Sequence, residues 1–199
     1  MDKFLKAYNI TIGHEGGYVN DPDDRGGETY KGIARKHWPH WKGWELLDMI
    51  KDRYGLANIN SSLARNTGMQ NYVQQFYYEN FWLPLQCDSF HFIIASELFD
   101  TAVNQGVGTS AKYLQQALNK LNRNQKDYPD LKVDGGIGLI TKEAYKSYFN
   151  TARFASRNSE KLLKWILRWL NYYQLKRYDL ITNKDLTQEK FIPGWTERT

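Results

Sequence analysis

The sequence is almost without cysteine, which limits how the fold can be stabilised. Cys87 is the only cysteine among the 199 residues, so the chain holds no second thiol for an internal disulfide. Folding therefore does not depend on an oxidising compartment. A small disulfide-bonded scaffold is excluded, and a packed hydrophobic core has to hold the fold.

Long apolar runs are also missing. No stretch reaches the roughly 20 apolar residues that a membrane-spanning helix needs. The opening segment MDKFLKAYNITIGHEGG has neither the apolar centre nor the small-residue cleavage site of a secretory signal. We therefore expect no stable membrane insertion and synthesis in the cytoplasm without a signal peptide. Any work outside the cell membrane would then need another exit route.

The composition is that of a packed globular protein of one domain or two small ones, with 41% hydrophobic and 25% charged residues. The net charge of +5 fits a polyanionic partner such as nucleic acid, a membrane surface or the bacterial cell wall, and it fits equally a mildly basic enzyme without a charge-driven partner. Lysine and arginine are scattered among acidic residues rather than clustered, which disfavours a nucleic-acid binder. Charge alone leaves the wall and the membrane surface open.

Apolar residues recur at helical spacing through most of the chain, whereas the alternation typical of strands is scarce. The stretch 18–33 is rich in Gly, Asp and Asn, and predicts a hairpin or an ordered loop. The sequence therefore predicts a mainly α fold with one small β element after the first helix. The helices are expected over residues 3–14, 41–55, 69–84, 92–106, 109–122, from Thr141 onward, and over 159–182.

The stretch HEGGYVNDPDDRGGETYKGI, residues 14–33, concentrates carboxylates and turn-forming residues behind the first helix. Read as a calcium loop from Asp21, it has Asp23 and Gly26 at suitable positions. However, Arg25 stands where an oxygen ligand belongs, and Gly32 stands where a bidentate glutamate is required. The calcium interpretation fails at these two positions.

A glycosidase site fits the same stretch better, because glycoside hydrolysis uses two carboxyl groups in opposite roles. Glu15 follows the first helix, whose negative end raises the pKa of a carboxyl, as a general acid requires. Asp24, nine residues on, is favoured as the second carboxylate by its spacing, and Asp21 and Asp23 compete with it. Thr29 supplies a hydroxyl that could orient a water. A polar surface hairpin without function is the remaining interpretation.

Other residues have both a functional and a structural interpretation. Asp100 and Asn104 share one helix face at i and i+4, where they line a glycan groove or cross-link helices. Trp195 and Arg198 close such a groove or anchor the tail.

Aromatic and histidine residues cluster just past the loop. Trp38, Trp41 and Trp44 stack on sugars or belong to the core. His37 and His40 lack a third ligand at a telling distance, which favours a structural role over metal binding.

Several motifs together resemble a known family. Glu15, an Asp nine residues later and the Thr-x-x-Gly-Ile that follows are similar to phage-type lysozymes, with the threonine shifted by one position. The fuller string EGGYVNDPDDRGGETYKGI resembles the glycoside hydrolase family 108 muramidases, also called putative secretion activators. The resemblance extends along nearly the whole chain through YYENFW, FDTAVNQG, VDGGIGLIT and FIPGWTERT. The Asp-Gly segment is the weakest of these, because many peptidoglycan-binding modules share it.

The resemblance implies a lysozyme-like helical fold and cleavage of the β-1,4 bond between N-acetylmuramic acid and N-acetylglucosamine. Glu15 matches the catalytic glutamate, and Tyr18 of the same string is expected to contact the substrate, as are Asp100, Asn104 and Trp195. Neither a cofactor nor a metal is expected. The partners are peptidoglycan glycan strands and, for export, a holin, as in an endolysin, so the protein would act at the wall or in the periplasm.

Three regions follow from the resemblance: a catalytic region over 1–90, a helical peptidoglycan-binding-like region over 91–182, and a tail over 183–199. Two other functions stay open at this point. A lytic transglycosylase needs only the glutamate and forms an anhydro product. A non-catalytic wall-binding or secretion-assisting protein would use the Asp-Gly segment and the basic charge.

Overall fold

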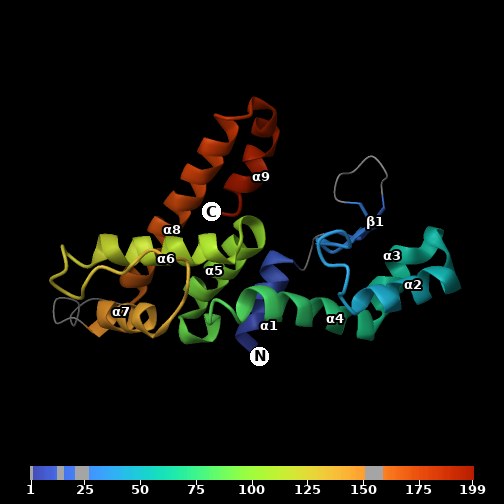
Figure 1. Cartoon of the computed structure of the whole chain (residues 1–199), viewed down its shortest axis with the longest axis horizontal. Coiled ribbons are helices and arrows are strands. Elements are labelled where there is room, and N and C mark those ends of the chain that lie inside the picture. The colour runs from blue at the N-terminus through green and yellow to red at the C-terminus, as the bar shows by residue number, and fades with distance from the viewer. Residues whose placement is uncertain (1, 13–15, 21–26, 151–158) are drawn as a thin grey trace. The chain divides into compact units, whose positions relative to one another are not determined.

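Helices make up most of the chain (Figure 1). The computed structural model describes residues 2–12, 16–20, 27–150 and 159–199. By its internal contacts the chain divides into two units, Met1–Asn80 and Phe81–Thr199. Among the described residues, no helix combines the length and the apolar content that crossing a bilayer requires.

Along the described part of the chain, the first unit has one α-helix, then a small sheet, and then three further α-helices. Helix α1 buries Phe4, Ala7 and Tyr8 on one face, at the spacing of an amphipathic helix. The elements in chain order are α1 (Asp2–Thr11), β1 (Tyr18–Val19), β2 (Thr29–Tyr30), β3 (Ile33–Ala34), α2 (Gly43–Tyr54), η1 (Leu56–Asn58), α3 (Ile59–Arg65), α4 (Thr67–Tyr77) and the π-helix η2 (Tyr78–Trp82), which continues α4 into the second unit.

The three strands form an antiparallel sheet in the order β1-β2-β3, with Tyr18 opposite Tyr30 and Tyr30 opposite Ile33. Lys31 and Gly32 connect β2 to β3 with positive φ angles of 44° and 77°, which is the type I′ hairpin turn. The Tyr77 hydroxyl donates a hydrogen bond of 2.7 Å to the Lys31 carbonyl. A Cβ atom at position 32 would lie 2.8 Å from that hydroxyl oxygen, so glycine lets the turn pack against α4.

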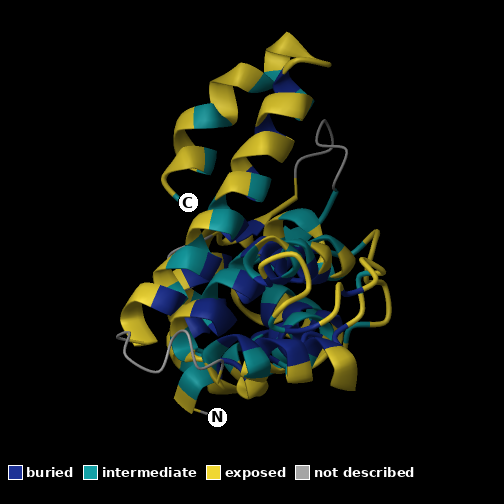
Figure 2. Ribbon diagram, turned by 90° about the vertical axis from the view of Figure 1, so that its left-hand side faces the viewer, coloured by how far each residue is buried: buried dark blue, intermediate teal, exposed yellow. Residues whose placement is uncertain are grey.

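The second unit is built around three helices that pack on one another, α5 (Phe92–Gln105), α6 (Val107–Leu121) and α8 (Ser159–Thr182). The buried Ser110 hydroxyl of α6 donates to the Leu98 carbonyl of α5 at 2.7 Å. Along α8, buried residues recur every four positions from Leu162 to Thr182, as the dark blue bands in Figure 2 show. The other elements of this unit are η3 (Cys87–Ser89), α7 (Leu139–Asn150), η5 (Leu186–Phe191) and α9 (Ile192–Thr196).

The mainly α fold and the small hairpin after the first helix are confirmed. The structure adds a third strand, and it adds short helices that the sequence did not predict. Helix α3 has seven residues and buries only Ile59 and Leu63, too few for a helical period to stand out. The helix expected over 69–84 changes into a π-helix at Tyr78.

Candidate active site

The predicted catalytic carboxylates stand in two stretches outside the described residues. Glu15 belongs to 13–15, and Asp24, with its competitors Asp21 and Asp23, belongs to 21–26. The structure does describe the chain on both sides of each stretch. The anchoring of these flanks is therefore what the structure contributes to the site.

The backbone is held before and after Glu15. On the N-terminal side, Ile12 is 1% exposed and its N–H donates to the Tyr8 carbonyl at 2.7 Å. On the C-terminal side, Gly16 has a φ of 51°, in the left-handed region that favours glycine. A Cβ atom at Gly17 would lie 2.3 Å from the side-chain oxygen of Asn60, closer than real contacts allow.

Asn60 of α3 holds the start of the sheet. Its side-chain oxygen accepts a hydrogen bond from the Tyr18 N–H at 2.5 Å, and its amide nitrogen donates to the Tyr18 carbonyl at 3.5 Å. The side chain thus replaces a neighbouring strand on the outer edge of β1, three residues past Glu15. Nothing in the sequence singles out Asn60, because its partner is 42 residues away.

Glu28 lies at the far end of the predicted catalytic loop and is at the centre of a cluster of ion pairs. Its side chain is 12% exposed and pairs with Arg35 at 2.9 Å and Lys51 at 3.1 Å. Asp48 pairs with the same two cations, at 2.9 and 3.2 Å. The Tyr18 hydroxyl completes the cluster by donating to Glu28 at 2.8 Å.

The pKa values in this cluster follow from burial and charge. Burial acts to raise the pKa of Asp48, but hydrogen bonds from Arg35 and Lys51 outweigh it and lower that pKa. Burial acts to lower the pKa of Lys51, but Glu28 and Asp48 raise it. Burial and the Glu28 hydrogen bond raise the pKa of Tyr18, which keeps its hydroxyl protonated as a donor. The ion pairs and the Tyr18 hydrogen bond tie β1 to α2.

Tyr18 and Thr29, two of the predicted site residues, are both part of the sheet. The Tyr18 ring is 9% exposed, and its hydroxyl is taken up by Glu28. The Thr29 hydroxyl donates to the Gly27 carbonyl at 3.1 Å, which leaves its oxygen lone pairs available as acceptors. Their roles in binding substrate and orienting water stay predictions.

The three tryptophans that follow the sheet separate into core and surface. Trp44 is 4% exposed and lies under the Arg35 guanidinium, 4.6 Å from its ring centre. Trp41 is partly buried and packs edge-on against Trp44 at 5.0 Å. Trp38 is 39% exposed and packs edge-on against Phe76 of α4.

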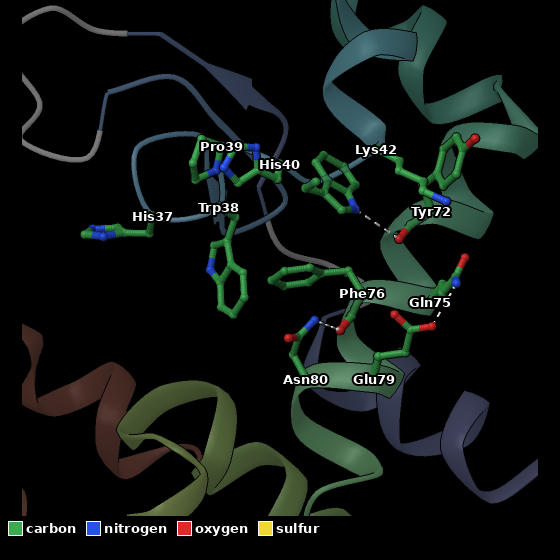
Figure 3. Close-up of a pocket in the computed structure, with 11 residues that line it drawn as sticks. His37, Trp38, Pro39, His40, Lys42, Tyr72, Gln75, Phe76, Glu79 and Asn80 are labelled. Carbon is green, nitrogen blue, oxygen red and sulfur yellow. Dashed lines mark hydrogen bonds between the residues drawn. The ribbon is translucent and has the colours of Figure 1, made fainter.

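Trp38 and Trp41 line a pocket of about 510 Å³ within the first unit (Figure 3). We call it the tryptophan pocket. One wall is the segment 37–42 and the other comes from α4 and η2. Its lining residues are His37, Trp38, Pro39, His40, Trp41, Lys42, Tyr72, Gln75, Phe76, Glu79 and Asn80. His37 and His40 belong to no group of three metal-ligating side chains among the described residues.

The remaining predicted site residues lie in the second unit. The Asn104 amide donates to the Asp100 carboxylate at 3.1 Å, and Arg198 approaches the other Asp100 oxygen at 3.4 Å. Trp195 stacks on Tyr178 of α8 with ring centres 4.8 Å apart. These contacts anchor the C-terminal segment on α5 and α8. Contact of Asp100, Asn104 and Trp195 with glycan stays a prediction.

Glu97 is a titratable group in the second unit that the sequence did not indicate. It accepts a hydrogen bond from Gln174 of α8. Burial and the neighbouring Asp100 raise the pKa of Glu97 to about 7, against the lowering effect of Gln174. Its position on the face of α5 that meets α8 becomes apparent only when the helices pack.

Comparisons with known proteins give matches along nearly the whole chain. Residues 8–106 match the family model described as glycosyl hydrolase 108, and residues 109–199 match a predicted peptidoglycan domain. The structure of Brucella abortus SagA is similar, with a TM-score of 0.58 and 22% identity over 99% of this chain and 89% of that chain. None of the curated proteins matches the chain. The predicted mainly α, lysozyme-like fold is confirmed, and the boundaries near residues 90 and 182 stay predictions.

Proposed function

We propose, since the chain belongs to the glycosyl hydrolase 108 family, that it is a peptidoglycan hydrolase of the N-acetylmuramidase type. It would cleave the β-1,4 bond between N-acetylmuramic acid and N-acetylglucosamine. The observation that carries the proposal is the succession of a glycosidase region, residues 8–106, and a predicted peptidoglycan domain, residues 109–199. The glycosidase region contains Glu15, Asp24 and Thr29.

In this proposal Glu15 is the general acid. It protonates the oxygen of the leaving sugar while an ionised carboxylate, Asp24, acts on the other side of the scissile bond. Thr29 helps to orient the attacking water through its oxygen lone pairs. The anchoring of Ile12, Gly17 and Tyr18 on either side of Glu15 supports the proposal, because a general acid has to be held at hydrogen-bond distance from its target.

The substrate sets where the protein works. Glycan strands of peptidoglycan lie outside the cytoplasmic membrane, so we propose action at the bacterial wall or in the periplasm after release. A holin is the proposed export partner, as in an endolysin. Expression in a bacterial host should then cause lysis only when a holin is co-expressed, and lysis that is equally fast without one would contradict the holin proposal.

Replacing the acid tests the proposal. Glu15→Gln keeps the shape of the side chain but cannot deliver the proton, so the rate of sacculus clearing should fall by about 10²–10⁴-fold. Glu45→Gln, at an exposed position of α2, is the matched control and should retain the wild-type rate. A Glu15→Gln rate within a few-fold of wild type would remove Glu15 from the mechanism.

A non-catalytic wall-binding protein is the second candidate, and the peptidoglycan domain at residues 109–199 is the observation that favours it. Such a protein would sediment with sacculi and release no fragments from them. A lytic transglycosylase would release fragments that end in anhydro sugars. Mass analysis of the soluble products therefore separates the three functions.

A further inference from the structure

We infer that the tryptophan pocket binds one N-acetylated pyranose ring of a glycan strand, an inference that rests on the proposed function for the choice of ligand. Thr29, the predicted catalytic residue that the structure describes, is not among its lining residues. Its volume of about 510 Å³ lies within the range of small-molecule sites, which runs from about 300 to 1,000 Å³.

Trp38 presents a large apolar surface on a rigid support. Its indole is 39% exposed and meets the Phe76 ring at 4.8 Å and 88°. The Trp38 N–H donates to the Ala34 carbonyl at 3.0 Å, and the Trp38 carbonyl accepts the Trp44 indole N–H at 2.7 Å. The two hydrogen bonds fix the Trp38 backbone, and the Phe76 ring supports its indole. The exposed ring therefore loses little conformational freedom when a ligand covers it.

A pyranose ring matches such a surface. The C–H bonds on one face of a β-linked sugar form a flat apolar patch that can pack on an indole, while the hydroxyl and acetamido groups point outward from the ring edge. An aromatic side chain suits a ligand that has one apolar face and a polar rim, because the ring buries the apolar face and leaves the rim free for hydrogen bonds. The pocket therefore needs hydrogen-bonding groups beside the indole, and α4 and η2 provide them.

Glu79 and Asn80 are two of the polar residues on the wall formed by α4 and η2, as Figure 3 shows. One Glu79 oxygen accepts from the Gln75 amide at 2.8 Å, and the Asn80 amide nitrogen donates to the Phe76 carbonyl at 2.8 Å. These bonds orient both side chains. The second Glu79 oxygen and the Asn80 oxygen are then placed to accept from sugar O–H and N–H groups.

The backbone at this wall is unusual in a way that supports a binding site. Glu79 and Asn80 lie in the π-helix Tyr78–Trp82, which follows α4 directly and winds with a different period. π-Helical turns are rare, and they occur frequently at functional sites because they change the direction in which side chains project.

The pocket is lined by charges of both signs. Glu79 brings a carboxylate to the η2 wall, which disfavours a nucleotide polyphosphate with several negative charges more than a sugar with one carboxylate or none. Lys42 at the rim provides a positive charge that complements the lactyl carboxylate of N-acetylmuramic acid. The pocket therefore fits an N-acetylated sugar, and the lysine adds a preference for the muramic acid ring.

Calorimetry on the Glu15→Gln protein tests the inference without turnover. Chitotetraose and a tetrasaccharide of alternating N-acetylglucosamine and N-acetylmuramic acid are the two probes. In the double variant that carries Trp38→Ala as well as Glu15→Gln, the probe that binds should bind about tenfold more weakly. The control, Met49→Ala, removes another exposed apolar side chain (67% exposed) on α2 and should leave affinity unchanged.

The outcomes are distinguishable from those of the proposed function. If the wild-type protein releases no product from sacculi and glycan binding still depends on Trp38, the proposed hydrolase function is refuted and the binding role of the tryptophan pocket is supported. Hydrolysis with unchanged affinity in Trp38→Ala, or no binding of either probe, would overturn the pocket. Trp38→Phe, which keeps a ring at the position, should recover part of the affinity and exclude a folding defect as the cause. Stronger binding of the muramic acid probe that is lost in Lys42→Gln would assign the carboxylate contact.

Discussion

At the scale of single residues, the backbone next to Glu15 depends on two neighbours, Gly17 and Asn60. The absence of a side chain at Gly17 allows the Asn60 amide to reach both backbone groups of Tyr18. The glycine pair is visible in the sequence as a turn signal. Its second role, making room for Asn60, is not, because that contact depends on the fold.

The contact leads to a prediction for Gly17→Ala. The new Cβ atom would lie 2.3 Å from the Asn60 side-chain oxygen, so Asn60 and β1 have to move apart. We expect a loss of about 1–3 kcal/mol in the free energy of unfolding and a fall in sacculus clearing, measured by denaturant titration and by turbidity. Gly108→Ala, where a Cβ meets nothing within 4 Å, is the control. A Gly17→Ala protein with wild-type stability and rate would refute this role.

The second carboxylate is also a question at the scale of residues. If Asp24 activates the water, Asp24→Asn should lower turnover by about 10²-fold or more and leave the thermal unfolding midpoint unchanged. Asp21→Asn and Asp23→Asn are internal controls in the same loop and should remain active. Loss of activity in one of these controls, with Asp24→Asn active, would assign the role to that residue instead.

At the scale of elements, the sequence predicts the features that depend on local residue patterns. It does not predict the features that depend on how one element packs against another. The hairpin is predictable because glycine, aspartate and asparagine cluster where the chain turns. Most of the long helices are predictable from apolar periodicity. The π-helix is not, and neither is the burial of Glu97 between α5 and α8, because both depend on how neighbouring helices pack. The sequence does not separate the exposed Trp38 from the buried Trp44 either, because the difference between them depends on the same packing.

The pairing of α5 with α8 should make stability depend on pH. Because the folded-state pKa of Glu97 is raised to about 7, the folded state binds a proton more tightly than the unfolded chain. The stabilisation is present below the ordinary glutamate pKa and is lost as pH rises through about 7. Glu97→Gln should therefore be more stable than wild type at pH 8, by about 1–3 kcal/mol.

Denaturant unfolding at several pH values between 4 and 8, roughly the range bounded by the two pKa values, measures this effect. Asp100, which is paired with Arg198, is the neighbouring acidic group that adds to the raised pKa of Glu97. Glu143→Gln, at an exposed position of α7, is the control and should keep the wild-type pH profile. A Glu97→Gln protein with that same profile would show that Glu97 does not titrate with a raised pKa.

At the scale of the whole molecule, the proposed function combines a region for cutting a polymer with a region for holding it. Residues 8–106 match a glycosidase model and residues 109–199 match a predicted peptidoglycan domain. The net charge of +5 suits an anionic wall, and it adds long-range attraction that salt would screen. The sequence indicated this combination through short motifs spread along the chain, whereas composition and charge alone left several polyanions open.

The central claim is that the protein hydrolyses the bond between N-acetylmuramic acid and N-acetylglucosamine. Digestion of purified sacculi in ¹⁸O-labelled water tests this claim most directly. Hydrolysis by an N-acetylmuramidase should place one labelled oxygen on each new reducing end, and mass spectrometry should find that end on N-acetylmuramic acid. The Glu15→Gln protein should release almost none of this product. Unlabelled anhydro ends, labelled ends on N-acetylglucosamine, or no soluble fragments at all would contradict the account.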